Sequence, residues 1–324
     1  MQLHPNYRNL LAAFIGLFFL YLVYLLFGPG SDLSRIPHGL TVDLQSLVNY
    51  CVLAVESGGY AVRKIHQEKQ MQAKVKGKTK EGAKEFVTKA DLISNAIILD
   101  LMTKFPGIKL VSEEKDPMAK STFEPYKVDK YDLWLASQEI LQDIPNEQIP
   151  LSDTVVWIDP LDATQEYTED LTHYVTVMMC IVVKGRPKFG VIYRPFSKQI
   201  GKSNIIIVSR SHAGDVQKLA EHAFHEMKVE PAGGSGYKTL RVLNGTADMY
   251  VHMTAIKKWD VCAGDAIIRA AGGQMVTLKG DTLTYFAGDS PKNTDGLLVA
   301  LRTPFQYLQQ LNQAQNIETA EPAV

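Results

Sequence analysis

The chain has 324 residues, and its 34 Lys and Arg residues nearly balance its 35 Asp and Glu residues, which leaves a net charge of −1 at pH 7. Hydrophobic residues make up 46% and charged residues 21%, an ordinary globular balance that excludes wholesale disorder. A charge near zero provides no extended positive field for a nucleic-acid polymer. The 3 cysteines lack CxxC or Cys/His spacing, which argues against a disulfide scaffold and a zinc module, so Cys262 is expected to pack in the core.

An uncharged apolar run, LLAAFIGLFFLYLVYLLF, occupies residues 10–27. At ~1.5 Å per residue a helix of this length spans about 27 Å, enough to cross a thin bilayer. A cleaved signal peptide is the alternative, but the run exceeds the usual ~7–15-residue apolar region and no A-x-A-like site follows it. Residues 1–9 contain Arg8 and no acid, so the positive-inside rule makes them a cytosolic tail. We therefore expect a type II signal anchor of ER or Golgi membranes, followed by a stem at 28–40.

The first part of the body predicts two helices. Thr41 is expected to cap the first, which ends in the basic stretch KVKGKTKEGAK at 74–84, interpreted as a mobile loop. Thr88 and Asp91 have the spacing of a capping box, although Asp91 replaces the usual Glu, and they begin a second helix that stops before Pro106. Asp91 is therefore either a cap residue or a functional carboxylate.

Apolar runs bounded by turn residues then predict six strands, with a hairpin connection at 184–187 between the third and the fourth. The runs lie at 108–112, 154–159, 175–183, 189–194, 205–209 and 247–252. Helical patterns follow Asp162, His212, Gly236 and Trp259. This order predicts an α+β or α/β fold with a metal-binding half at 41–195, a second half at 196–316 that shares a cleft with it, and a flexible tail at 317–324.

Three acidic motifs stand where a strand ends or a helix begins. They are Ser112-Glu113-Glu114, the stretch DPLDAT at 159–164 and the stretch WDVCAG at 259–264. Each acid has an ordinary explanation by itself: Asp162 and Asp260 can complement a helix dipole, and Glu113-Glu114 can be a solvated turn. If the acids converge, however, two charges ~4 Å apart repel by roughly 4 kcal/mol at an effective dielectric near 20, and they require cations. Oxygen ligands without nearby histidines favour Mg²⁺.

The DPLD loop suits a metal-assisted reaction at phosphorus. Pro160 fixes the turn, and the carbonyl of Leu161 can face the site between Asp159 and Asp162, so one loop offers three oxygens to two ions. Thr164 begins a helix whose first free amides, those of Ala163 and Thr164, form an anion site beside the metals. The arrangement predicts phosphoryl hydrolysis.

The three motifs together resemble the lithium-sensitive, magnesium-dependent phosphatase superfamily of inositol monophosphatases, fructose bisphosphatases and 3′-nucleotidases. Its members have an acid pair after a strand, D-P-[LI]-D-[GA]-T and W-D-x-x-A-G, and the similarity covers residues 41–307. The resemblance implies a layered αβαβα sandwich. It also implies one Mg²⁺ held by Glu113, Asp159 and the Leu161 carbonyl, and another held by Asp159, Asp162 and Asp260; a third ion is left open.

The same resemblance assigns roles in catalysis. Glu114 would support the metal ligands from behind. A water hydrogen-bonded to Thr164 and oriented with Asp91 would attack phosphorus in line with the leaving 3′-oxygen.

The DATQEY continuation at 162–167, with the apolar N-terminal run, is similar to the Golgi nucleotide phosphatases of this superfamily. That similarity implies hydrolysis of the 3′-phosphate of adenosine 3′,5′-bisphosphate, the by-product of sulfotransferases, to AMP and phosphate in the Golgi lumen. Two alternatives remain open: an inositol or sugar phosphate phosphatase of the same fold, and a catalytically silent membrane-tethered binding module. The oligomeric state is also open, with a homodimer as one option.

The residues assigned to substrate contact lie in two turns before helices, together with Ala163. They are Ser209, His212, Gly234, Gly236 and Lys238. The competing interpretation is a surface turn with a solvated lysine. His252 is expected to be structural, and Lys257 and Lys258 either raise the potential beside Asp260 or face solvent. Asn244-Gly245-Thr246 is a candidate glycosylation acceptor if the body is luminal.

Overall fold

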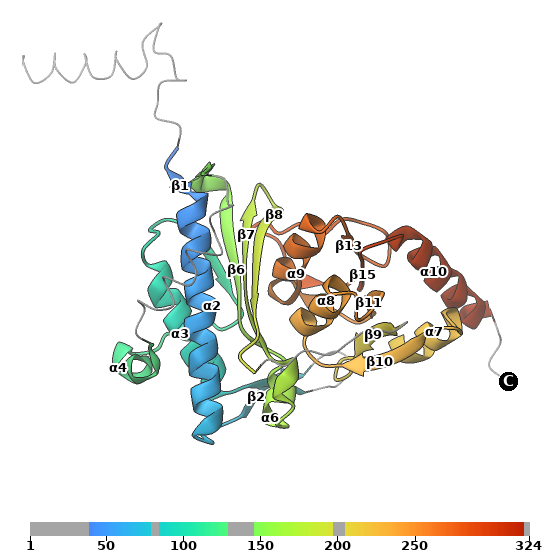
Figure 1. Ribbon diagram of the computed structural model, residues 1–324, viewed down its shortest axis with the longest axis horizontal. Coiled ribbons are helices and arrows are strands. Elements are labelled where there is room, and N and C mark those ends of the chain that lie inside the picture. Colours follow the sequence, from blue (N-terminus) through green and yellow to red (C-terminus); the bar gives the residue numbers. More distant parts are fainter. Residues whose placement is uncertain (1–38, 79–83, 129–145, 197–204, 321–324) are drawn as a thin grey trace, which may run out of the picture.

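The computed structural model describes residues 39–78, 84–128, 146–196 and 205–320 of the chain (Figure 1). The expected cytosolic tail, the expected membrane span at 10–27 and nearly all of the expected stem lie outside these ranges. Within them, no helix has both the length and the apolar character needed to cross a membrane.

Five layers make up the body, as the resemblance implied (Figure 1). Two helices cover one face of a four-stranded sheet, two more lie between this sheet and a five-stranded sheet, and two cover the outer face of the second sheet. The first sheet has the order β4-β6-β7-β8 and the second the order β10-β9-β11-β15-β13. The helices, in layer order, are α2 (Leu44–Gln67), α3 (Lys89–Met102), α8 (Ser235–Leu243), α9 (Lys258–Ala270), α7 (Val216–Ala223) and α10 (Pro304–Ala320).

Six of the nine strands that the structure describes in the two sheets confirm the predicted apolar runs, whereas β10, β13 and β15 were not predicted. The nine strands are β4 (Lys109–Ser112), β6 (Thr154–Asp162), β7 (Thr176–Val183), β8 (Arg186–Tyr193), β9 (Ile205–Ser209), β10 (Lys228–Ala232), β11 (Met249–His252), β13 (Gln274–Val276) and β15 (Leu297–Ala300). The smaller elements are β1 (Thr41–Asp43), β2 (Lys74–Lys78), β3 (Lys84–Val87), α4 (Lys120–Phe123), β5 (Gln148–Pro150), α6 (Thr164–Thr168), β12 (Ile256–Lys257) and β14 (Lys292–Asn293). Short 3₁₀ turns cover Glu124–Tyr126, Leu151–Asp153 and Thr172–Tyr174.

The first sheet is mixed, and its parallel pair positions the acids. Strands β4 and β6 run parallel with Ser112 opposite Ile158, so the residues that follow each strand meet at one edge. Strands β7 and β8 continue the sheet antiparallel and join through Lys184 and Gly185. Both turn residues have positive φ, 52° and 73°, as in a tight two-residue hairpin. The predicted hairpin is therefore confirmed.

Two expectations for the first half were wrong. Thr41 does not cap a helix: it pairs with Pro150 in a small antiparallel sheet, and Asp43 caps α2 by accepting a hydrogen bond from the Ser46 amide at 2.7 Å. The basic stretch forms strands β2 and β3 on either side of the undescribed residues 79–83. Both errors come from strand pairing, which the local sequence does not reveal.

The expected tail was also placed too early. Helix α10 extends to Ala320 and so includes the first residues of segment 317–324. Leu308, Leu311 and Ala314 follow the spacing of one helix face and pack into the core outside the second sheet. This packing explains why the polar C-terminal sequence remains helical.

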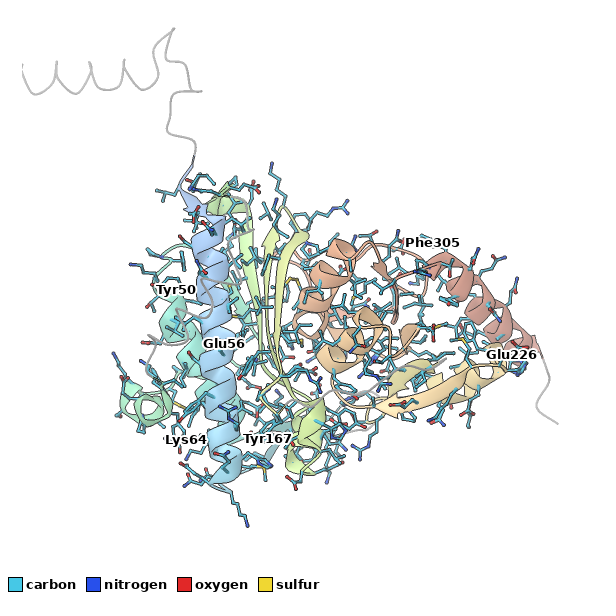
Figure 2. The ribbon with its side chains drawn as sticks, viewed as in Figure 1. Tyr50, Glu56, Lys64, Tyr167, Glu226 and Phe305 are labelled. Atoms are coloured by element: carbon cyan, nitrogen blue, oxygen red, sulfur yellow. A yellow bond between two sulfur atoms is a disulfide. The ribbon has the colours of Figure 1, made fainter. Side chains whose placement is uncertain are left out.

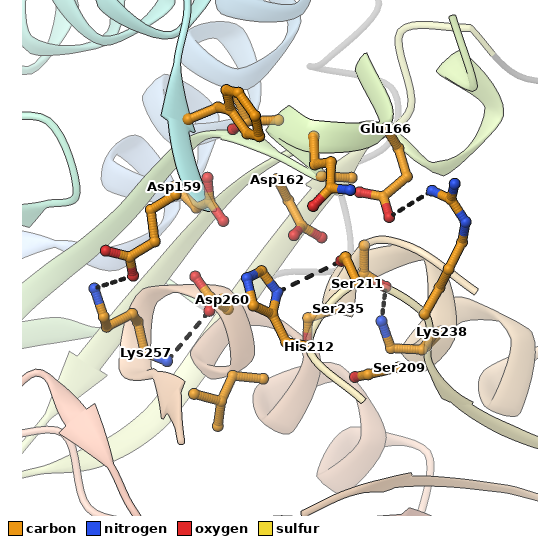
Figure 3. Close-up of a pocket in the computed structure, with 18 of the residues that line it drawn as sticks. Asp159, Asp162, Glu166, Ser209, Ser211, His212, Ser235, Lys238, Lys257 and Asp260 are labelled. Atoms are coloured by element: carbon orange, nitrogen blue, oxygen red, sulfur yellow. Dashed lines mark hydrogen bonds and ion pairs between the residues drawn. The ribbon is translucent and has the colours of Figure 1, made fainter. Parts of the chain in front are cut away.

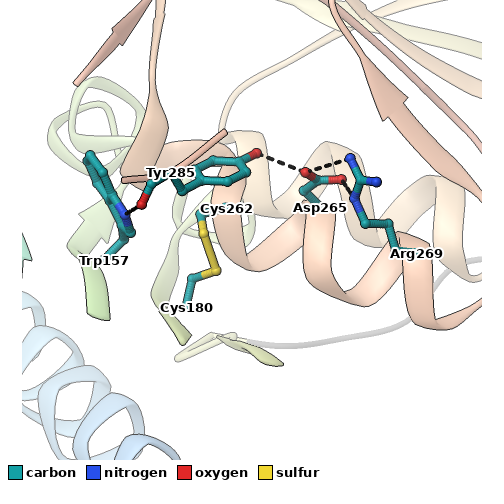
Figure 4. The surroundings of a disulfide bond; sticks show 6 residues. All are labelled: Trp157, Cys180, Cys262, Asp265, Arg269 and Tyr285. Atoms are coloured by element: carbon teal, nitrogen blue, oxygen red, sulfur yellow. Dashed lines mark hydrogen bonds and ion pairs between the residues drawn. A yellow bond between two sulfur atoms is a disulfide. The ribbon is translucent and has the colours of Figure 1, made fainter. Parts of the chain in front are cut away.

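Cys180 on β7 and Cys262 on α9 form a disulfide, which corrects the expectation that Cys262 only packs (Figure 4). The two Cα atoms lie 5.7 Å apart although 82 residues separate them in sequence. Cys51 is left as a buried free thiol. Three cysteines can form one disulfide and leave one free thiol. The choice of Cys180 and Cys262 as the bonded pair depends on the contact between β7 and α9, which the sequence does not show.

Thiol titration tests this pairing. We expect the denatured, unreduced protein to show one reactive thiol, from Cys51, and the reduced protein to show all 3 cysteines. Three thiols without reduction would contradict the Cys180–Cys262 bond.

Helix α9 also packs very closely on β8. A Cβ atom built on Gly190 would lie 2.2 Å from the carbonyl oxygen of Ala263, which is backbone and cannot rotate away. We expect Gly190→Ala to lower the free energy of unfolding by about 1–3 kcal/mol, the usual effect of overpacking. Urea unfolding followed by circular dichroism measures the change. Gly288→Ala is the matched control, because a Cβ there meets nothing within 4 Å; equal stability of the two variants would contradict the close packing.

Candidate metal and phosphate site

The capping box at the start of α3 forms as predicted, and its acid also faces the site. Asp91 is fully buried; its Oδ2 accepts hydrogen bonds from the Thr88 amide (2.8 Å) and the Thr88 hydroxyl (2.5 Å). Its Oδ1 accepts from the Thr164 hydroxyl at 2.9 Å, a bond that joins α3 to α6. Burial raises the pKa of Asp91 to about 7, while the bonds from Thr88 oppose this rise. Asp91 is therefore both a cap residue and the partner of Thr164.

Two further polar residues on α3 hold the acidic loops, and the sequence analysis did not single them out. The Ser94 hydroxyl donates to the carbonyl oxygen of Pro160 at 2.8 Å, and the Asn95 side chain donates to that of Glu114 at 2.9 Å. Both side chains are buried. They lie three and four residues after Asp91, so the helical period places all three on one face. The spacing from Asp91 was the feature of the sequence that could have identified Ser94 and Asn95 as site residues.

Helix α6 is fixed from its other end. Tyr167 lies close to α2 (Figure 2), and its hydroxyl donates to the Val62 carbonyl oxygen of that helix at 2.9 Å. Tyr167 is itself completely buried. The DATQEY continuation therefore ties the residues after the DPLD loop to the first helical layer.

Three acids from separate segments converge as predicted. Glu113 follows β4, Asp159 lies on β6, and Asp260 lies in the first turn of α9; one carboxylate oxygen from each lies within 4.8 Å of the others. Burial raises the pKa of Asp159 and of Asp260 well above the usual range, and each neighbouring carboxylate raises it further. The donor set is entirely hard oxygen and strongly anionic, so it fits a divalent cation such as Mg²⁺.

Asp162 lies beside this group and faces the same space (Figure 3). Its Oδ2 accepts hydrogen bonds from the Gly236 amide (2.8 Å) and the Thr176 hydroxyl (3.2 Å). Burial raises its pKa to about 6, and the charge of Lys238 opposes the rise. Asp162 therefore joins the acidic group to α8, on the opposite side of the cleft.

The Leu161 backbone turns within the loop as expected. Its amide donates to Asp159 Oδ1 at 3.1 Å, and its carbonyl oxygen lies 3.1 Å from the Thr164 hydroxyl, whose single proton is used in the shorter bond to Asp91. Ala163 has a left-handed backbone with φ of 68°, which turns the chain sharply before α6. Both residues line the pocket.

Lys76, on strand β2, is a site residue that the sequence analysis missed. Its ammonium lies 2.7 Å from Glu113 Oε1 and 2.5 Å from Glu114 Oε1. Glu114 is buried and shares this lysine with Glu113, which agrees with a supporting position. The signal was the basic stretch itself, but its place over the acids depends on the β2–β3 pairing.

The two lysines before Asp260 separate in the structure. The backbone amide of Lys257 donates to Asp260 Oδ2 at 3.2 Å, and the residue lines the pocket. The ammonium of Lys258 pairs instead with Asp289 at 2.7 Å. Of the two, Lys257 is therefore the one placed to raise the potential beside Asp260.

The opposite wall of the same pocket comes from the second half of the chain. It includes Ser209, His212, Gly234 and Lys238 from the predicted substrate set (Figure 3). The Lys238 ammonium is buried and donates to the Gly234 carbonyl oxygen at 2.8 Å; burial lowers its pKa to about 8. Gly236 does not line the pocket, because its amide is turned toward Asp162.

An ion-pair group on the pocket wall joins the two halves of the chain. Arg210 pairs with Glu166 at 3.2 Å and with Glu169 at 2.5 Å, which links the segment after β9 to α6. Glu166 is almost fully buried. This contact was not predicted, because it depends on how the two halves meet.

Comparisons with known proteins agree with this geometry. A sequence model of the inositol monophosphatase family matches residues 45–204 and 201–314. A curated Golgi-resident adenosine 3′,5′-bisphosphate 3′-phosphatase from Mus musculus is 40% identical over 320 residues, which cover 87% of this chain and 86% of that protein. Inositol monophosphatase 3 from Xenopus tropicalis is 37% identical and covers 91% of this chain and 86% of its own length.

Solved structures share the fold at low sequence identity. The extragenic suppressor protein suhB from Bartonella henselae superposes with a TM-score of 0.59 at 17% identity. The alignment covers 83% of this chain and 99% of that one. The family model and the identity to the curated relatives lead to one conclusion: this chain is a member of the inositol monophosphatase family.

Proposed function

We propose that this protein is a Mg²⁺-dependent phosphatase that removes the 3′-phosphate of adenosine 3′,5′-bisphosphate and yields AMP and phosphate. The observation that carries the proposal is the convergence of Glu113, Asp159 and Asp260 at one end of a pocket with a wall of polar and cationic groups. The name of the mouse relative supports the nucleotide as substrate. The 3′-phosphate lies at the acids, and the nucleoside extends along Ser209 and His212.

The residues fit two cations. Glu113, Asp159 and the Leu161 carbonyl would hold one ion, and Asp159, Asp162 and Asp260 would hold the other. When bound, magnesium supplies positive charge that activates water and stabilises the leaving oxygen. The 4.8 Å group of Glu113, Asp159 and Asp260 supports this assignment, and the place of Asp162 beside it supports the second set.

The protein itself orients the water and the phosphate. Asp91 Oδ1 accepts from the Thr164 hydroxyl at 2.9 Å, which fixes the Thr164 oxygen at the pocket wall. There the oxygen can accept a hydrogen bond from the attacking water, and the water's proton can pass through the hydroxyl to Asp91. The amides of Ala163 and Thr164 bind the phosphate oxygens. Lys238 adds positive charge on the opposite wall, where it is held by backbone carbonyls. These groups make the site complementary to phosphoryl transfer.

The proposed location is the Golgi membrane, with residues 10–27 as a type II anchor and the catalytic body in the lumen. Three observations support it: the mouse relative is named Golgi-resident, the run at 10–27 is apolar and uncharged, and Cys180 and Cys262 form a disulfide, a bond typical of oxidising compartments. In the lumen the enzyme would remove the by-product of sulfotransferases. Asn244 is exposed just after α8 and is the proposed glycosylation site.

The competing functions differ in what they require. Hydrolysis of an inositol phosphate is favoured by the name of the Xenopus relative and uses the same acids. A silent binding module would not require Glu113, Asp159, Asp260 and the Asp91–Thr164 pair to be present together, as they are here.

A comparison of substrates tests the proposed activity. With Mg²⁺, we expect phosphate release from adenosine 3′,5′-bisphosphate at a higher kcat/KM than from inositol monophosphate or fructose bisphosphate, with AMP as the nucleotide product. Chromatography identifies the product. Added Li⁺ should lower the rate of phosphate release, as the resemblance to lithium-sensitive phosphatases implies. A higher kcat/KM for inositol monophosphate would show that the nucleotide is not the preferred substrate. No phosphate release from any of these esters would favour the binding module.

Replacing one carboxylate tests the metal assignment. Asp159→Asn should lower kcat by more than ~100-fold, since even groups behind metal ligands cost ~10–100-fold when lost. Asp116→Asn, at an exposed position, is the matched control and should keep full activity. Phosphate release at saturating Mg²⁺ measures both. Equal rates of phosphate release for the two variants would contradict the assignment of Asp159 as a metal ligand.

A further inference from the structure

Two side chains behind Ser209, those of His252 and Thr254, form a hydrogen-bonded row with it, and the row determines which atom donates in each bond. The Thr254 hydroxyl donates to the carbonyl oxygen of His212 at 2.8 Å. A hydroxyl has one proton, so toward His252 Nε2, at 3.0 Å, the Thr254 oxygen can only accept. The proton of the His252 ring therefore lies on Nε2.

His252 is neutral in this environment. It is 4% exposed, and burial lowers its pKa to about 3, with the positive charges of Lys238 and His212 acting in the same direction. A backbone hydrogen bond with Ala255 favours the protonated ring but does not offset burial. A neutral imidazole with its proton on Nε2 has a lone pair on Nδ1 and can only accept there.

Ser209 must then be the donor in the next bond. Its hydroxyl oxygen lies 2.6 Å from His252 Nδ1, the shortest contact in the row, while the Tyr250 hydroxyl lies at 3.4 Å from the same nitrogen. Because the Ser209 proton is used in this bond, the Ser209 oxygen presents only lone pairs to the pocket that it lines.

We propose that His252 and Thr254 are positioning residues that hold Ser209 as a hydrogen-bond acceptor for an O–H or N–H group of the nucleoside. This proposal rests on the proposed function and specifies which part of the substrate lies at Ser209. An ionised phosphate has only acceptors and would meet the Ser209 lone pairs without a proton between them. The second phosphate of the substrate therefore does not lie at Ser209. In adenosine the matching donors are the ribose 2′-hydroxyl and the amino group of the base.

Substrate analogues distinguish these two donors. The first analogue is 2′-deoxyadenosine 3′,5′-bisphosphate, which lacks the hydroxyl, and the second is purine riboside 3′,5′-bisphosphate, which lacks the amino group. In the wild-type protein, removing the group that meets Ser209 should lower kcat/KM by ~5–100-fold, mainly through KM, because a buried acceptor is left unpaired. In Ser209→Ala the ratio between the full substrate and that analogue should fall to near one.

Two variants of His252 separate positioning from a merely structural role. An Asn side chain can place its oxygen near the position of Nδ1, so His252→Asn should keep the wild-type ratio. A Gln side chain places its amide near Nε2 instead, so His252→Gln should move the ratio toward one although Ser209 is still present. His222→Gln is the matched control and should keep the ratio, because His222 is exposed and does not line the pocket. Circular dichroism confirms that each variant is folded.

The outcomes are distinct. If the wild-type protein hydrolyses the full substrate and both analogues with the same kcat/KM, the acceptor role of Ser209 is wrong while the proposed function stands. If His252→Gln keeps the wild-type ratio and lowers kcat equally for all substrates, His252 is only structural. If the wild-type protein does not hydrolyse adenosine 3′,5′-bisphosphate, the proposed function fails first and this proposal fails with it.

Discussion

Repulsion among buried carboxylates is the constraint on which this structure depends. Glu113, Asp159 and Asp260 bring oxygens within 4.8 Å of one another, and each like-charge pair at ~4 Å costs roughly 4 kcal/mol at an effective dielectric near 20. Lys76 offsets part of this cost at Glu113. A divalent cation bound here would offset more, because it would interact with all three acids at once. On the proposed function, the fold maintains a local electrostatic strain that metal binding would relieve.

Much of the surrounding architecture holds these charges in place. The parallel pairing of β4 and β6 delivers Glu113 and Asp159 to one edge of the first sheet. Asp260 comes from α9, which is held against that sheet by the close approach of Gly190 and by the disulfide at Cys262, two residues farther along the helix. The middle helical layer is thus part of the site as well as part of the core.

Buried polar side chains then determine orientation on both walls of the pocket. On one wall, α3 uses Asp91, Ser94 and Asn95 to hold Thr164 and the acidic loops. On the other, His252 and Thr254 hold Ser209. Buried polar groups of this kind are costly unless they are paired, and each side chain named here has a hydrogen-bond partner that fixes its orientation.

The sequence predicted six of the strands and the acids because these depend on local patterns, whereas the layered arrangement was implied by the family resemblance. Apolar runs identify strands such as β6, and Asp159, Asp162 and Asp260 stand where strands end or helices begin. It did not predict the β1–β5 pairing, the Lys76 contact, the Arg210 ion pairs or the Cys180–Cys262 bond, which join segments that are distant in sequence. Ser94 and Asn95 were within reach, since they share a helix face with Asp91.

The most direct test of the central constraint is the thermal stability of the wild-type protein and of Glu113→Gln, each measured with and without Mg²⁺. Without the ion, we expect the variant to have the higher Tm, because one of the three repelling charges is gone. With Mg²⁺, we expect the Tm of the wild-type protein to rise with ion concentration and that of the variant to respond much less. A wild-type Tm that does not change with Mg²⁺ would contradict the account.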